Sequence, residues 1–272
     1  MAQRPRRDVT ARPEASSSRR TTGWLVAVGL VALACFVIAT LPASLLAGRV
    51  QPYQLGASGY SGTIWSGTAN GFAWRGATLG DLQWRLRPWA LLRGRIAADV
   101  AMSLPGGSAS AALSAGPSGQ IALDDVNLDL PLEALSALPV ASVRGWQGRA
   151  AGHFDTLSVA AGSLQDARGT LDLTGLVSPA PNHTPYGSYR FVIPDPAVAT
   201  TGAAPGVTAH MSDLGGSLAV DGRVTFSAGR SYLLEGTVAP RGNAPESLQR
   251  ALQFLGPADA AGRRPFSVSG TL

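Results

Sequence analysis

The stretch Ile96-Ala-Ala-Asp-Val-Ala-Met-Ser-Leu104 decides the fold class of this chain. An apolar side chain stands at every second position, from Ile96 through Val100 to Leu104. Successive side chains of a β-strand point to opposite faces, so this period of two predicts a strand that is buried on one face. Antiparallel sheets commonly pack one face and expose the other. We therefore expect the stretch to be one strand of an antiparallel sheet.

The same period returns further along the chain. It predicts strands over 218–226, 232–238 and 266–272, separated by glycine or proline as in antiparallel meanders. The least regular region, 177–206, is expected to be a pair of loops around one strand at 189–193. Because the 272 residues include 33 glycines and 19 prolines, short strands and turns are favoured over long helices. We predict a mainly β fold, with one twisted antiparallel sheet and one or two short helices.

One predicted strand changes phase in its middle. Its apolar residues move from odd to even positions, at Ile121, Leu123, Val126, Leu128 and Leu130. One extra residue in a strand shifts the alternation in this way, so we predict a β-bulge at Asp124 and Asp125. The alternative is a paired-carboxylate or metal site, but no histidine or further acid has the spacing to complete it.

Two helices are predicted in the second half of the chain. A short one over 132–138 lies between two prolines. A longer one over 244–255 has Asn243 as its N-cap and Glu246 to complete a capping box, and it ends at Gly256.

The N-terminal region has a different pattern. Residues 24–41, WLVAVGLVALACFVIATL, contain no charge, and about 20 apolar residues span the ~30 Å hydrocarbon layer of a bilayer. A cleaved signal peptide would have a shorter apolar region followed by a small-x-small cleavage site, which is missing after Leu41. We predict an uncleaved transmembrane anchor at 23–42 and a linker at 43–52.

The distribution of charge predicts the orientation of this anchor. All 22 basic residues are arginine, and six of them precede residue 21. Basic residues next to a membrane span stay on the cytoplasmic side. We therefore expect residues 1–22 to be a disordered cytoplasmic tail, and 53–272 to be a periplasmic β-rich domain attached to the inner membrane. After residue 48 there are sixteen arginines and fifteen acidic residues, so the domain lacks the excess of positive charge that a nucleic-acid-binding protein has.

Residues that carry chemistry are sparse. The three histidines are far apart, and the one cysteine, Cys35, lies inside the apolar segment. No nucleophile elbow, P-loop or dinucleotide-binding glycine pattern occurs. We expect the histidines to lie in loops or on strand surfaces, and we predict no enzymatic activity, no cofactor and no metal.

An early group of aromatic residues is the one local concentration in the domain: Trp65, Phe72, Trp74, Trp84 and Trp89. Aromatic side chains bury large areas, so one interpretation is that they form the core. The other is that they line an exposed surface for lipid or protein. The sequence leaves both interpretations open.

Several phrases of the sequence resemble a known family. They are Gly62-Thr63-Ile64-Trp65-Ser-Gly67-Thr-Ala69, Leu82-Gln-Trp84-Arg-Leu-Arg-Pro88, Leu91-Leu-Arg-Gly94 and Leu252-Gln-Phe-Leu255-Gly256-Pro-Ala-Asp-Ala-Ala-Gly262. In this order, after an apolar anchor, they resemble the N component of the bacterial type II secretion system, the general secretory pathway protein N family.

The resemblance implies a single-pass inner-membrane protein without enzymatic activity. Such a protein would be an accessory part of a machine that moves folded proteins from the periplasm across the outer membrane. Its implied partners are other secretion components, among them inner-membrane proteins and the outer-membrane secretin, and membrane lipid through the anchor. The residues that carry the family motif and could make contacts are Gly62, Thr63, Ile64, Trp65, Gly67, Trp84, Leu255, Gly256 and Gly262.

A second group of proteins has a similar general organisation. Periplasmic proteins of the AsmA type combine an N-terminal anchor with long curved sheets and are associated with lipid traffic, although they are much larger. The alternative function is therefore lipid binding in a groove. A continuous apolar trough would favour lipid, and a filled core with polar surfaces would favour contacts with proteins.

Overall fold

The computed structural model describes residues 30, 33, 36, 37, 39–46, 54–135, 144–160, 163–181, 183–195, 207–227, 231–242 and 244–271. The chain divides into two compact units, Met1–Leu41 and Pro42–Leu272. The tail predicted at 1–22 and most of the anchor predicted at 23–42 lie outside the described residues. Within the described residues, none of the helices has both the length and the apolar character needed to cross a membrane.

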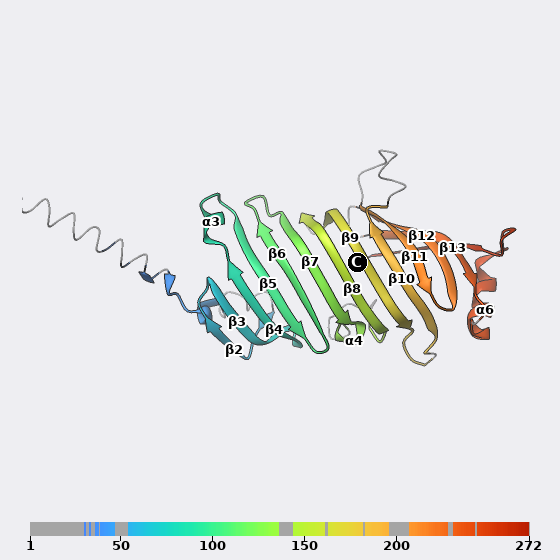
Figure 1. Cartoon of the computed structure of the whole chain (residues 1–272), viewed down its shortest axis with the longest axis horizontal. Coiled ribbons are helices and arrows are strands. Elements are labelled where there is room, and N and C mark those ends of the chain that lie inside the picture. The colour runs from blue at the N-terminus through green and yellow to red at the C-terminus, as the bar shows by residue number, and fades with distance from the viewer. Residues whose placement is uncertain are drawn as a thin grey trace, which may run out of the picture. The chain divides into compact units, whose positions relative to one another are not determined.

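The described part of the second unit is built on one 14-stranded antiparallel sheet (Figure 1). Its strands are β1 (Leu55–Gly56), β2 (Gly59–Gly62), β3 (Ser66–Trp74), β4 (Ala77–Leu86), β5 (Ile96–Leu104), β6 (Gly107–Ala115), β7 (Ile121–Pro131), β8 (Gln147–Ala160), β9 (Ser163–Val177), β10 (Pro185–Ile193), β11 (Val207–Gly215), β12 (Leu218–Ser227), β13 (Ser231–Pro240) and β14 (Arg264–Thr271). From β3 to β14 each strand pairs with the next, and β1 and β2 both pair with β3. The predicted mainly β, antiparallel fold is confirmed.

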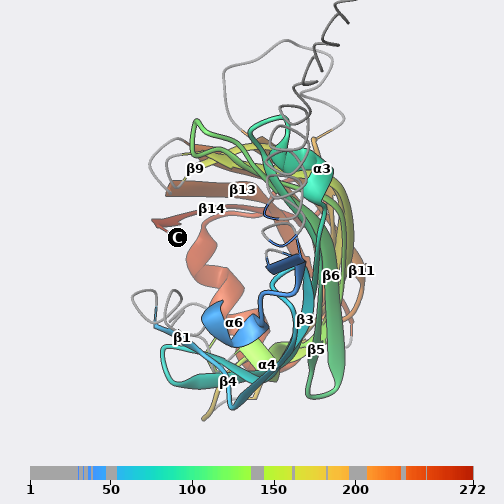
Figure 2. The same cartoon turned by 90° about the vertical axis from the view of Figure 1, so that its left-hand side faces the viewer.

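Short helical segments connect or flank the strands. They are η1 (Ala43–Leu46), α3 (Pro88–Leu91), α4 (Leu132–Leu135), α6 (Glu246–Leu252) and η4 (Gln253–Leu255). Figure 2 shows that the sheet is strongly curved and that α4 and α6 lie inside the curve. The concave face is therefore the one on which the helices pack.

The register places the apolar residues of neighbouring strands on one face. Val100 lies opposite Trp84 on one side and Ala111 on the other, and Val220 lies opposite Val238. Because each strand alternates apolar and polar residues, this register makes one face of the sheet apolar and the other polar.

The buried core forms where helices cover the apolar face. Leu248 and Leu252 of α6 pack in one cluster with Tyr189, Val220 and Val238. In a second cluster, Leu132 of α4 packs with Leu130 and Ala150. Burial raises the pKa of Tyr189 to about 12, while its hydroxyl donates a hydrogen bond of 2.8 Å to the carbonyl oxygen of Tyr186.

The predicted β-bulge is present in β7. Ser110 of β6 lies opposite Asn127, and Ala112 lies opposite Asp124, so Asp125 has no partner in the register. Asp125 has a φ of +52°, which aspartate tolerates better than most residues. The change of phase therefore reflects a local backbone irregularity.

The boundaries predicted for the longer helix are wrong. The α-helix begins at Glu246 with Pro245 as its N-cap, no side chain makes a capping hydrogen bond, and Asn243 lies outside the described residues. The predicted capping box is therefore wrong, because the residue before a proline, here Ala244, is biased away from helical dihedrals. The last predicted turn is the 3-10 helix η4, and Gly256 ends it with a φ of +95°.

Three other segments differ from or extend the predictions. The shorter helix is described only over Leu132–Leu135, since 136–138 lie outside the described residues. The strand predicted at 189–193 begins earlier, at Pro185, because register shifts around Gly187 let the irregular part continue the ladder. The helix α3 was not predicted.

Candidate functional site

The early part of the predicted family motif, Gly62 to Gly67, forms the turn between β2 and β3. Gly62 and Gly67 face each other across this turn, and the backbone N–H of Thr63 donates to the carbonyl oxygen of Ser66 over 2.8 Å. Gly62 has a φ of +87°, and a Cβ there would lie 2.5 Å from the carbonyl oxygen of Ser66. Only glycine fits this position, because a side chain would be strained and would overlap backbone.

The next strand closes the turn. Trp84 of β4 pairs in register with Gly67, and its indole Nε1 donates a hydrogen bond of 3.0 Å to the carbonyl oxygen of Ile64. A Cβ at Gly67 would lie 2.6 Å from the ring atom Cζ2 of Trp84 and 2.6 Å from the carbonyl oxygen of Ser61. The indole therefore lies against the bare backbone of Gly67, and the structure brings the two parts of the early motif together.

The turn also holds the beginning of the domain. Pro42 forms an isolated antiparallel bridge with Thr63, and η1 contacts β2 and β3. Ala43 is buried at 1% exposure. On the other side, the backbone N–H of Leu86 donates to the carbonyl oxygen of Trp65 over 2.6 Å. The segment predicted as a linker therefore starts with residues that pack on the sheet, directly after the apolar stretch.

The early aromatic residues fall into two groups. Trp65, Phe72, Trp74 and Trp84 are half-buried, whereas Trp89 is 78% exposed. The structure therefore places Phe72, Trp74 and Trp84 on strands and Trp65 in the turn before β3, and leaves Trp89 available for contacts.

The late part of the motif lies at the other end of the sheet. Leu255 and Gly256 follow α6, and Gly262 lies in the turn before β14, where its N–H donates to the carbonyl oxygen of Asp259 over 2.9 Å. Leu255 is 38% exposed, and the neighbouring Phe254 is 92% exposed. Nine strands, β5 to β13, separate this group from Trp84, so the structure does not form one site from all nine motif residues.

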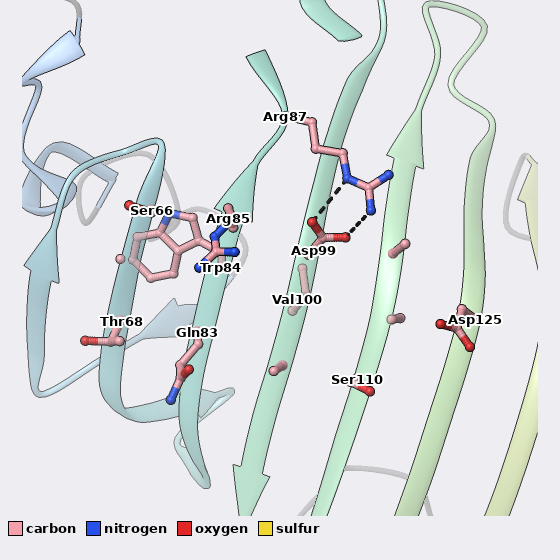
Figure 3. A pocket seen from close by; sticks show the side chains of 14 residues that line it. Ser66, Thr68, Gln83, Trp84, Arg85, Arg87, Asp99, Val100, Ser110 and Asp125 are labelled. Atoms are coloured by element: carbon pink, nitrogen blue, oxygen red, sulfur yellow. Dashed lines mark hydrogen bonds and ion pairs between the residues drawn. The ribbon is translucent and has the colours of Figure 1, made fainter. Parts of the chain in front are cut away.

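A shallow, open trough of about 630 Å³ runs beside the early motif, across β3 to β7 (Figure 3). Its most polar part is the ion pair in which Arg87 donates from Nη2 to Oδ1 of Asp99 over 2.5 Å and from Nε to Oδ2 over 3.1 Å. This hydrogen bonding raises the pKa of Arg87. Small side chains such as Ser110 and Ala112 line much of the rest, so the trough offers no enclosed pocket.

The polar face pairs many of its charges across neighbouring strands. Arg149 and Arg190 make two-pronged pairs with Asp129 and Asp172, with N···O distances between 2.5 and 2.8 Å. These hydrogen bonds lower the pKa values of both aspartates. Carboxylates held in this way stay ionised and are poor candidates for general acid or base catalysis.

The three histidines lie on separate elements of the described part of the chain. Within the described residues, no three His, Cys, Asp or Glu side chains are arranged to hold a metal ion. His153 and His210 lie on the surfaces of β8 and β11, and His183 lies in the loop between β9 and β10, as predicted. The described residues offer binding surfaces and sheet edges, the features of a class of proteins that act through contacts.

Comparison with known proteins places the chain in a family within this class. Residues 53–267 match the family model "Type II secretion system (T2SS), protein N", so the chain belongs to the protein N family of the type II secretion system. It is similar to the type II secretion system protein N of Aeromonas hydrophila, with 27% identity over 91% of this chain and 98% of that protein. It is also similar to the protein of that name from Vibrio cholerae serotype O1, with 30% identity over 87% and 93% of the two chains. No solved structure gives a significant match.

Members of this family are non-enzymatic components of the secretion system. This agrees with the resemblance that the motif phrases suggested. The sequence analysis did not predict one group of exposed residues near the site, which lies at the tip around α3. Pro88 at the first helical position and Gly94 after the helix were the signals that could have indicated it.

Proposed function

We propose that this protein is an accessory inner-membrane component of a type II secretion system. In this proposal one helix at 23–42 anchors the chain, the arginine-rich tail stays in the cytoplasm, and the β-domain works in the periplasm. There it helps folded proteins cross the outer membrane by binding other components of the system, inner-membrane proteins or the secretin. Family membership and the uncharged segment beside the arginine-rich tail support the proposal.

The open C-terminal edge of the sheet is the observation that carries the proposal. Within the described residues β14 pairs only with β13, so the other edge of this eight-residue strand has unpaired backbone groups. Its second half, 267–271, contains no charge or proline, the features by which natural proteins usually protect an edge. A strand of a partner can add to such an edge through main-chain hydrogen bonds.

The opposite edge is less accessible. There β1 and β2 contain only two and four residues, and Pro42 and η1 pack beside β2. The exposed Phe254 and Leu255, by contrast, lie in the 3-10 helix that contacts β14. The motif residues at the C-terminal end therefore lie close to the edge that is free to bind a partner.

Site-specific photo-cross-linking tests this contact surface in living cells. A photoreactive residue at Ser269 or Phe254 should cross-link to identified secretion-system proteins, and the same proteins should copurify from gently solubilised membranes. Ser103 is a matched control, because it is exposed like Ser269 but lies on β5 with a strand on each side. Cross-links that are equally strong from Ser103, or that contain no secretion component, would contradict the proposal.

A specific observation also favours lipid binding as a second candidate function. The apolar face continues beyond the two core clusters, and half-buried residues such as Leu113, Leu123 and Leu157 lie side by side on it. An apolar concave surface of this kind suits acyl chains. If the purified protein carries phospholipid, and deletion of the gene alters outer-membrane permeability with secretion intact, lipid binding is the better description.

A further inference from the structure

The tip that joins β4 to β5, residues 87–96, exposes large apolar side chains to solvent. Trp89 and Leu92 are 78% and 79% exposed, and no residue of α3 is buried. Leu91 and Ile96 beside them are exposed at 45% and 53%. Among the large apolar side chains of the described part of the chain, only Phe254 is more exposed than Trp89 and Leu92. A contiguous apolar group of this kind marks a surface that contacts a partner or a membrane.

The tip is an ordered structure. The backbone N–H of Ala90 donates to the carbonyl oxygen of Arg87 over 3.1 Å, and that of Arg95 donates to the carbonyl oxygen of Ala90 over 3.1 Å. Gly94 donates to Leu91 over 2.9 Å and has a φ of +67°, so glycine suits the position that ends the helix. The backbone therefore holds Trp89 and Leu92 at an ordered, solvent-exposed tip.

Positive charge surrounds the apolar residues. No acidic residue occurs between 82 and 98, and Arg87 is already paired with Asp99. Arg93 and Arg95 are exposed, and their side chains have no ion-pair partner among the described residues. Tryptophan and leucine beside unpaired arginines are typical of segments that lie in the interface of an anionic bilayer.

The tip lies near the point where the chain leaves its apolar stretch. That stretch ends at Leu41, and the next residue, Pro42, is bridged to Thr63. Trp65 lies two residues after Thr63, and its carbonyl oxygen accepts a hydrogen bond from the backbone N–H of Leu86. Leu86 in turn lies three residues before Trp89. With about 5 Å for each pairing and at most about 3.5 Å per residue, Trp89 lies within roughly 30 Å of Pro42. Figure 1 accordingly shows α3 at the same end of the sheet as β3 and β4.

We propose that the tip at 87–96 is a second membrane contact of the domain. Trp89, Leu91 and Leu92 enter the interfacial layer of the leaflet that faces the domain, and Arg93 and Arg95 bind the phosphates of anionic lipids. The proposal rests on the proposed single-pass topology, because in that topology the chain leaves the bilayer directly before Pro42, which is bridged to Thr63. With the anchor and the tip both attached, the sheet is held in one orientation, and its β14 edge points in a fixed direction.

The test uses the full chain in vesicles that contain phosphatidylglycerol. In a Cys35→Ala background, Leu92→Cys carries an environment-sensitive dye, and Phe254→Cys carries the same dye as a control of similar exposure at the other end of the sheet. We expect lipids that carry a shallow quencher to quench the dye at position 92 and leave the dye at 254 unquenched. Arg93→Gln and Arg95→Gln should each weaken the tip–membrane equilibrium about fivefold, since a basic residue near an anionic surface contributes on this scale.

Carbonate extraction of the same vesicles tests the anchor separately. If the protein resists extraction and position 92 is quenched no more than position 254, the tip proposal is overturned while the anchor stands. If the protein is extracted but position 92 is quenched while it is bound, the anchor fails and the tip contact stands. A cross-link from position 92 to a protein, without quenching by lipid, would assign the tip to a protein partner and overturn the membrane contact.

Discussion

Replacing Trp84 with alanine is expected to lower the free energy of unfolding of the domain by about 3 kcal/mol. The indole is half-buried against Gly67, and its Nε1 donates to the carbonyl oxygen of Ile64. The substitution removes apolar contacts, leaves a cavity over the glycine and leaves the carbonyl of Ile64 without this donor. Urea unfolding of the full chain in detergent, followed by the circular dichroism of the strands, measures the change.

Trp89→Ala is the matched control for this prediction. Trp89 is also a tryptophan near the end of β4, but it is 78% exposed and lies on the tip. Its replacement should change the free energy of unfolding by no more than about 0.5 kcal/mol. If both variants unfold at the same urea concentration, Trp84 does not stabilise the motif turn as described.

Arg223→Gln is expected to destabilise the domain by about 3 kcal/mol. Asp195 is 1% exposed, and Arg223 of β12 donates from Nε to its Oδ2. The backbone N–H of Asp195 donates to Thr208 over 2.9 Å, so this pair fastens the end of β10 across β11 to β12. Without the guanidinium, a buried carboxylate loses this ion pair, and breaking a buried pair costs more than breaking an exposed one. Thermal unfolding of the full chain at neutral pH measures the effect.

A pair with the same chemistry on the surface provides the comparison. Arg149 holds Asp129 with two hydrogen bonds, but the aspartate side chain is 52% exposed. Solvent screens this pair, so Arg149→Gln should destabilise the domain much less than Arg223→Gln does. Equal losses from Arg223→Gln and Arg149→Gln would show that the burial of Asp195 does not determine the energy of its pair.

Features that depend on the alternation of apolar and polar residues within one strand were predicted correctly from the sequence. The alternation at 96–104 and the change of phase at Asp124 and Asp125 gave β5 and the bulge of β7 directly, because side-chain direction follows from residue count along one strand. The start of α6 was not predicted correctly, since Asn243 and Glu246 have the spacing of a capping box but Pro245 is the N-cap. The four residues of α3 are too few for any helical period.

The geometry of the motif could not be predicted, because it depends on pairing between strands. That Trp84 closes on Gly67 follows from the register of β3 with β4, and the sequence does not contain this register. The late residues Leu255, Gly256 and Gly262 were predicted from the same resemblance but lie at the other end of the sheet. Sequence order alone indicates neither the contact between Trp84 and Gly67 nor the distance of the late residues from them.

The most direct test of the central claim is to measure where a type II exoprotein accumulates when this gene is deleted. If the protein assists secretion, the folded, active exoprotein should remain in the periplasm, with its signal peptide removed because export across the inner membrane continues. The intact gene should restore the exoprotein to the medium. Unchanged secretion, together with altered outer-membrane permeability and phospholipid bound to the purified protein, would contradict the account.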